Sequence, residues 1–243
     1  MHLIAAILAI AAASDLQPAL PRLLAAFAKE SGHTVRATYG SSGNFFAQLR
    51  NGAPFDVFLS ADIDYPERLE TSGLAEPGTV IAYATGSIVL WARRGAGIDV
   101  RGGWTVLTSD RVKRISVANP DHAPYGRAAV AALRAAGVYD RVRAKLVFGE
   151  NVSQAAQFVQ SGNADVGIIP LSLARSAALS TAGDYSSIPP ALYPVIEQGA
   201  VVLRASPNKA AARAFLQYLQ RPDVVAALAQ AGFGAARART GRQ

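Results

Sequence analysis

The sequence predicts an α/β protein of two lobes, each a mainly parallel sheet flanked by helices, with a hinge of two crossovers. Its 243 residues are enough for one large domain or two of ordinary size. Short apolar strands alternate with helical patterns almost throughout, which is typical of α/β proteins. β-Rich segments at 87–91 and 200–203 enclose a second α/β unit. Two lobes joined by two crossovers imply a cleft that closes on a ligand.

The first lobe is expected to begin with a strand at 7–13. A helix follows, because leucines and phenylalanines recur at helical spacing until Gly32, a residue that ends helices. Further strands are predicted at 34–39 and 57–60. The helix between them starts after the sequence SSG and ends at NGAP (51–54).

The second unit is expected to hold helices after Tyr125 and Asn151, and strands at 115–118, 146–148 and 166–169. A last helical pattern, which includes Phe215, Leu216 and Leu219, is expected to return and pack on the first lobe. The predicted boundaries place residues 1–84 and 196–243 in lobe 1 and residues 85–195 in lobe 2.

The composition excludes several classes of protein. With 51% hydrophobic and 17% charged residues the chain is not disordered, and without cysteine it has no disulfide, thiolate zinc site or cysteine nucleophile. The net charge of +7 favours anionic partners. Because the basic residues are scattered and do not alternate with aromatic ones, nucleic acid is not expected to be the partner.

An apolar run at residues 3–13 is too short to span a bilayer, which takes about 20 residues. It has two interpretations, the apolar part of a secretion signal or the first strand of the fold. We prefer the strand, because there is no basic segment before it and cleavage after AAA (11–13) would remove a strand that the sheet needs. A longer export signal is then absent from this sequence or truncated.

Four turns stand where an α/β protein binds ligands, beyond the carboxyl ends of strands and at the starts of helices. They lie at residues 13–15, 40–43, 123–126 and 150–153, two in each predicted lobe. Helix N-termini present unpaired N–H groups and the positive end of a dipole. Meeting across a cleft, the four turns would surround a small anion with hydroxyl and backbone donors.

Each turn also has a purely structural interpretation. Ser14 with Gln17, and Asn151 with Gln154, fit the capping-box pattern, so these side chains could serve only their own helices. Ser41-Ser42-Gly43 is a common turn composition, and Tyr125 could be an ordinary half-buried aromatic residue. The binding interpretation depends on the four turns occurring together in a basic, two-lobed chain.

Motifs of common enzymes are absent from the sequence. There is no GxSxG turn, no GxxxxGK[ST] phosphate loop and no HExxH zinc motif. Asp62 and Asp64 could act as paired carboxylates, but acidic residues after a strand are more often solvated or bonded to loop amides. We therefore do not expect an enzyme.

Several long motifs resemble one family, the periplasmic molybdate-binding proteins of ABC importers. The matching stretches are AAASDL (11–16), YGSSGNF (39–45), QLRNGAPFDVFLSAD (48–62), YATGSIVLW (83–91), VANPDHAPYGRAA (117–129), GENVSQAAQFVQSGNADVG (149–167) and YPVIEQGAVVL (193–203). They are spread in order over most of the chain.

The resemblance implies a type II periplasmic-binding-protein fold that closes on one tetrahedral oxyanion, molybdate or tungstate. Carried over by motif, the ligand contacts are Ser14 and Ser42, through hydroxyl and N–H, and Tyr125 and Val152, mainly through N–H. No side chain would bind molybdenum directly, and no cofactor is expected. The implied protein is a periplasmic monomer that delivers the oxyanion to a membrane permease driven by an ATPase.

Two residues, Pro170 and Asp15, bear on the expected set of ligand contacts. Some family members have a tyrosine hydroxyl where this chain has Pro170, which offers neither a hydroxyl nor an N–H. Either the Tyr125 hydroxyl replaces that donor or the oxyanion has one contact fewer. Asp15 is expected to point away from the ligand, toward a contact between lobes or its own helix; an inward Asp15 would favour phosphate.

Other functions remain possible at this point. The same fold could bind sulfate or phosphate, or serve as the oxyanion-sensing domain of a transcription regulator. A regulator would need a helix-turn-helix segment, for which the sequence has no spare length.

Overall fold

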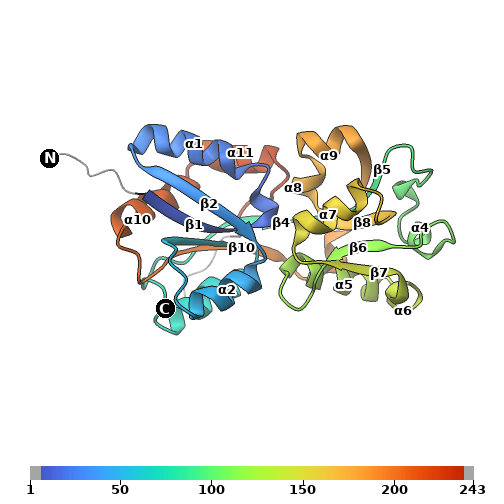
Figure 1. Cartoon of the computed structure of the whole chain (residues 1–243), viewed down its shortest axis with the longest axis horizontal. Helices are drawn as coiled ribbons and strands as arrows, with labels where there is room; N and C mark the ends of the chain where they lie inside the picture. The colour runs from blue at the N-terminus through green and yellow to red at the C-terminus, as the bar shows by residue number, and fades with distance from the viewer. Residues whose placement is uncertain (1–6, 238–243) are drawn as a thin grey trace.

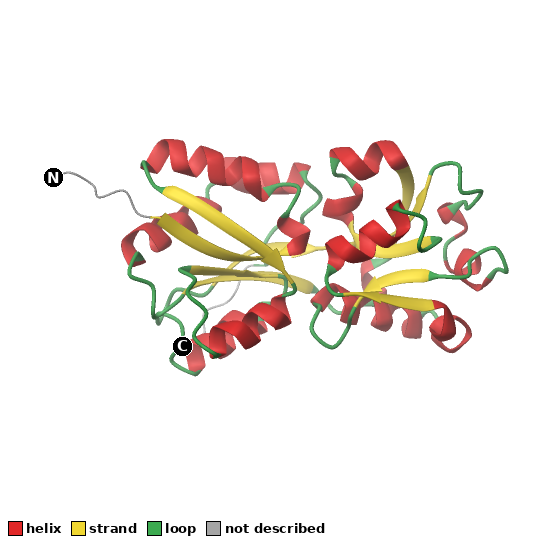
Figure 2. Cartoon of the chain, in the orientation of Figure 1, coloured by secondary structure: helices red, strands yellow, loops and turns green. Residues whose placement is uncertain are grey.

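The computed structural model describes residues 7–237. It forms two α/β lobes that lie side by side along the long axis of the molecule (Figures 1 and 2). Each lobe has one five-stranded sheet covered by helices. The predicted fold class is confirmed.

The sheet of lobe 1 has the strand order β2-β1-β3-β10-β4. Its strands are β1 (Ile7–Ala13), β2 (Thr34–Gly40), β3 (Val57–Ser60), β4 (Ile81–Gly86) and β10 (Ile196–Val202). Its helices are α1 (Leu20–Ser31), α2 (Ser42–Arg50), α3 (Asp64–Thr71), α10 (Lys209–Leu219) and α11 (Pro222–Gln230). A 3-10 turn, η1 (Ser14–Leu16), follows β1 directly.

The sheet of lobe 2 has the strand order β7-β6-β8-β5-β9. Its strands are β5 (Ile88–Arg93), β6 (Ile115–Ala118), β7 (Leu146–Gly149), β8 (Val166–Pro170) and β9 (Gly183–Ser187). Its helices are α4 (Trp104–Thr108), α5 (Pro124–Ala135), α6 (Tyr139–Val142), α7 (Val152–Gln160), α8 (Leu171–Ala174) and α9 (Ala177–Ala182). The 3-10 turns are η2 (Val100–Gly102), η3 (Arg143–Lys145) and η4 (Pro190–Leu192).

Alternation along the strands of lobe 1 buries side chains on both faces of the sheet. Val57 and Leu59 pack in one core with α1, α10 and α11, whereas Phe58 packs in the other with α2 and α3. The final helical pattern, α10, contributes Phe215 and Leu216 to the first of these cores, as expected. Lobe 2 has one core cluster, in which Trp91 is fully buried.

Both sheets are mixed, which corrects the expectation of mainly parallel sheets. In lobe 1, β1 pairs with β2 and β3 in parallel, but β10 runs antiparallel to β3 and β4. In lobe 2, β6 pairs in parallel with β7 and β8, but β5 runs antiparallel to β8 and β9. β5 and β10 run against their neighbours, and each is the first strand after a crossover between the lobes. Such a strand lacks the strand-helix-strand connection that makes neighbouring strands parallel.

The chain leaves lobe 1 after β4 and returns to it at β10. These two strands are neighbours, and Gly86 lies opposite Ile196. The predicted boundary after residue 84 falls inside β4. Parts of predicted lobe 1, residues 1–6 and 238–243, lie outside the described residues.

The first strand occupies Ile7–Ala13, as the sequence predicts. The alternative of a secretion signal concerns residues 3–6 as well, which lie outside the described range. Within the described part of the chain, no helix combines the length and the apolar character needed to cross a membrane.

Candidate functional site

One small cavity between the lobes collects all four predicted turns. Lobe 1 contributes Ser14 and Ser42 to its walls, and lobe 2 contributes Tyr125 and Val152. Only about 10 Å³ is open to the centre of a water molecule, so the walls already lie close together. A larger hollow, of about 810 Å³ and lined by residues between 93 and 101 and between 180 and 185, includes none of the four turns.

Ser42 is the first residue of α2 and is 1% exposed. Its Oγ accepts a hydrogen bond from the Ala61 N–H at 2.9 Å. A serine hydroxyl has one proton to donate in addition to its lone pairs. Since Ala61 uses only a lone pair, the Ser42 proton remains available to an anion in the cavity.

Ser14 does not cap a helix, which removes the structural interpretation of this residue. It is the first residue of η1, and the residue before the turn, Ala13, makes no side-chain cap. The Ser14 carbonyl accepts from the Gln17 N–H at 3.2 Å. Among the described residues the Ser14 hydroxyl makes no hydrogen bond, and it lies in the cavity wall, where it can donate to a ligand.

Asn151 caps α7, as its sequence pattern suggests. Its Oδ1 accepts from the N–H groups of Ser153 at 3.0 Å and Gln154 at 3.1 Å. The cap therefore satisfies the second and third N–H groups of the helix and leaves that of Val152, the first. Capping and ligand binding are compatible in this turn, because they use different N–H groups.

Tyr125 is the second residue of α5, after Pro124, and its N–H also belongs to the first turn. The cavity wall contains no lysine or arginine. Favourable charge comes instead from the N-termini of α2, α5 and α7, whose dipoles point their positive ends at the same space. Such a site can hold a small anion through neutral donors.

Asp15 also lines the cavity, and its carboxylate makes a contact between the lobes. Its Oδ2 accepts from the Tyr125 hydroxyl at 2.8 Å and from Gln198 Nε2 at 2.7 Å. The expected lobe contact of Asp15 is confirmed, whereas the expectation that Asp15 points away from the ligand is not, because Asp15 forms part of the cavity wall. Burial raises the pKa of Asp15 to about 6, although both hydrogen bonds oppose the shift. Its Oδ1 is buried and has no partner among the described residues.

The Tyr125 hydroxyl does not replace the donor that Pro170 lacks. It donates to Asp15, so its single proton is already used. Pro170 is the last residue of β8 and is buried. Of the two alternatives that the sequence left open, this geometry fits an oxyanion with one contact fewer.

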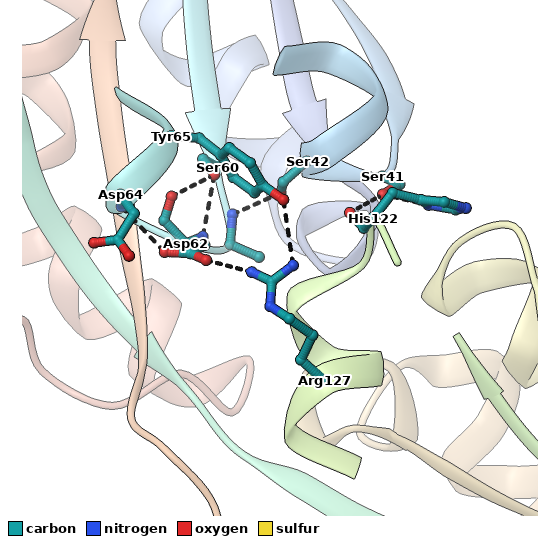
Figure 3. Close-up of polar contacts among 9 residues, drawn as sticks. Ser41, Ser42, Ser60, Asp62, Asp64, Tyr65, His122 and Arg127 are labelled. Atoms are coloured by element: carbon teal, nitrogen blue, oxygen red, sulfur yellow. Dashed lines mark hydrogen bonds and ion pairs between the residues drawn. The ribbon is translucent and has the colours of Figure 1, made fainter. Parts of the chain in front are cut away.

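Further contacts join the lobes at the rim of the cleft (Figure 3). The Arg127 guanidinium bonds to the Asp62 carboxylate and donates to the Tyr65 hydroxyl at 3.2 Å. Arg127 is thus engaged with lobe 1 and is not a clamp for the anion. Asp62 also accepts from the Asp64 N–H at 3.0 Å, which matches the loop-amide interpretation of this acidic pair.

At the turn formed by residues 40–43 of lobe 1, the Gly43 N–H donates to the His122 carbonyl at 2.9 Å. Ser41 donates its hydroxyl to the same carbonyl (Figure 3). A Cβ on residue 43 would lie 2.5 Å from that oxygen, so only glycine permits this approach of the lobes. Asn44 bonds to Glu150 nearby.

Gln198 and His122 also join the lobes, and neither was predicted from the sequence. Gln198 is fully buried within β10, next to Glu197. An amide inside a mostly apolar strand signals a buried hydrogen-bond partner, because a buried polar group without one is costly. His122 acts mainly through its backbone carbonyl, and nothing in its residue type indicates that role.

Two lobes with donor-bearing turns around a cavity between them are typical of a solute-binding protein. The sequence matches the model of the bacterial extracellular solute-binding protein family over residues 8–234. The chain belongs to this family.

Two curated relatives share more than a third of its residues. It is 37% identical to the molybdate-binding protein ModA of Azotobacter vinelandii over 225 residues, which cover 93% of this chain and 88% of that protein. It is 38% identical to ModA of Rhodobacter capsulatus over 228 residues, covering 93% and 87%. The solved structure of the Azotobacter vinelandii periplasmic molybdate-binding protein superposes with a TM-score of 0.88 at 36% identity, covering 95% of this chain and all of that one.

Proposed function

We propose that this protein captures molybdate or tungstate between its lobes outside the cytoplasm and delivers the oxyanion to an ABC transporter permease with its ATPase. It does so as a monomer, without a cofactor and without catalysis. Its relatives of more than one-third identity are molybdate-binding proteins. The ligand contacts are Ser14, Ser42, Tyr125 and Val152.

One observation carries the proposal: two turns from each lobe present donors, and no cationic side chain, to one cavity. A fully ionised tetrahedral oxyanion only accepts hydrogen bonds, so it suits such a wall. Phosphate is partly protonated at neutral pH and needs an acceptor. Asp15 Oδ2 is occupied by Tyr125 and Gln198, which leaves Asp15 Oδ1, without a partner among the described residues, as the carboxylate acceptor that a protonated phosphate would need.

Isothermal titration of the dialysed protein with molybdate, sulfate and phosphate in one buffer tests the proposal. We expect one-to-one binding of molybdate and a much weaker response to sulfate, because donors spaced for a larger tetrahedron cannot all reach a smaller one. Heat with sulfate or phosphate and none with molybdate would leave an oxyanion-binding protein of different specificity.

Replacing Ser42 tests the site itself. Ser42→Ala removes a hydroxyl donor to a charged ligand, worth about 1.5–3 kcal/mol, so the Kd for molybdate should rise about tenfold or more. Ser206→Ala is the matched control, since Ser206 is also buried in lobe 1 but bonds to Asp56 and lies outside the cavity. Equal affinity of the Ser42 variant and the wild type would remove Ser42 from the site.

A further inference from the structure

Gln198 is the centre of a buried hydrogen-bond network behind the cavity. Its Nε2 donates to Asp15 Oδ2 at 2.7 Å and to the Tyr125 hydroxyl at 3.0 Å. Its Oε1 accepts from the Tyr83 hydroxyl at 2.8 Å. Three of its hydrogen-bonding positions are thus filled by side chains that are themselves buried.

The members of this network come from both lobes. Gln198 and Tyr83 lie on β10 and β4, the two strands that adjoin the crossovers. Asp15 lies in η1, directly after β1, in lobe 1. Tyr125 is the one member from lobe 2.

The network is complete only while the lobes are together. If lobe 2 rotated away, Asp15 would lose the Tyr125 donor and Gln198 would lose one acceptor. Water replaces these partners once the cleft opens, but each direct hydrogen bond keeps a modest net advantage over its hydrated groups, so the network favours the closed form. Tyr83 fixes the Gln198 amide from within lobe 1, so the remaining donor stays aimed at the place that Tyr125 occupies.

We propose that Gln198 is a positioning residue for ligand capture, which holds Asp15 and Tyr125 together across the cleft and so favours closure even without ligand. For the retention of the oxyanion, the inference rests on the proposed function. For the closing of the empty protein it does not, because the network contains only side chains of this chain. Gln198 touches the ligand cavity only through Asp15 and Tyr125.

The first test measures closure without ligand. The chain has no cysteine, so Gln48→Cys on α2 and Ala135→Cys on α5, both exposed, provide two unique spin-label sites on different lobes. In the empty protein, Gln198→Leu should shift the distance distribution between the labels toward longer, open distances. Tyr83→Phe, which removes only the bond to Oε1, should shift it less. Distributions identical to that of the wild type would overturn the proposal.

The second test measures the kinetics of molybdate binding. Loss of the network should raise koff about tenfold with a smaller change in kon, because encounter uses the open cleft and retention uses the closed one. An unchanged koff would overturn the role in retention. If the wild type does not bind molybdate at all, the proposed function fails, and the label distances still decide the role in closure.

Ser206→Ala controls for the loss of a buried hydrogen bond that stays within lobe 1, and should change neither the distances nor koff. Circular dichroism and thermal unfolding check that each variant folds. If Gln198→Leu does not fold, Gln198→Asn serves instead, because it keeps the amide but shortens the side chain by one methylene. A closed distance distribution and normal koff in that variant would equally overturn the proposal.

Discussion

Two sets of contacts that join the lobes differ in character. Behind the cavity, Asp15, Tyr125 and Gln198 are buried and joined by hydrogen bonds at 2.7–3.0 Å. At the rim, Arg127 and Asp62 form an ion pair whose side chains are 41% and 25% exposed. The inner set has a single ionisable carboxyl, whereas the outer set pairs full charges in contact with solvent.

This difference indicates which set controls closure. Exposed ion pairs contribute little and are screened by salt. Buried hydrogen bonds are strongly directional and are screened much less by salt. The inner set should therefore decide whether the lobes close, and the rim should adjust the equilibrium only slightly.

The strongest way to break the inner set is steric. A Cβ on Gly86 would lie 2.2 Å from the Tyr125 hydroxyl oxygen and 2.8 Å from its Cζ. Gly86→Ala should therefore prevent full closure and weaken molybdate binding by about a hundredfold, since the two lobe 2 contacts are no longer in reach. Titration calorimetry and the label distances measure this. Adding Tyr125→Ala removes the obstructing ring and should restore part of the closure; no restoration would show that the block lies elsewhere.

The charge of the inner set predicts a dependence on pH. Asp15 has a pKa of about 6 in the folded protein against 3.8 as a free group, so its contribution to stability is full below pH 3.8 and is lost as the pH rises through about 6. Over that range it amounts to at most about 3 kcal/mol. The free energy of unfolding in urea, measured from pH 4 to pH 7.5, should lose this part of its pH dependence in Asp15→Asn. Parallel curves for variant and wild type would contradict the buried carboxyl.

The smallest effect is expected at the rim. Arg127→Gln removes the ion pair with Asp62, and molybdate affinity should fall by less than about fivefold. The difference from the wild type should vanish in high salt. Arg134→Gln is the matched control, because Arg134 lies on the same helix and stacks over Tyr139 within lobe 2. A larger loss than that caused by Gln198→Leu would reverse the ranking of the two sets.

Elements with strong local patterns were predicted well from the sequence. Strands β1, β3 and β6 have the predicted bounds, because each is a short apolar run between turn residues. The four turns were found because polar and small residues follow strands and begin helices. For residues of this kind, the residue type and its neighbours in the sequence indicate the structural role.

What the sequence did not predict depends on contacts distant along the chain. β9 (GDYSS) is a polar edge strand without an apolar run, and it forms only because β5 pairs with it. The antiparallel direction of β10 depends on where the chain re-enters lobe 1. The bond between Asp15 and Gln198 joins residues 183 positions apart, and no local pattern links them.

The neighbouring positions of β4 and β10 have one more consequence. Gly86 and Ile196 lie opposite each other in one sheet. The chain therefore leaves lobe 1 before residue 87 and returns after residue 195 at the same place. In topological terms the second lobe is a single insertion into a hairpin of the first. A gene fragment for this insertion would encode a chain whose two ends already meet, which makes it a natural unit to transplant or to circularise.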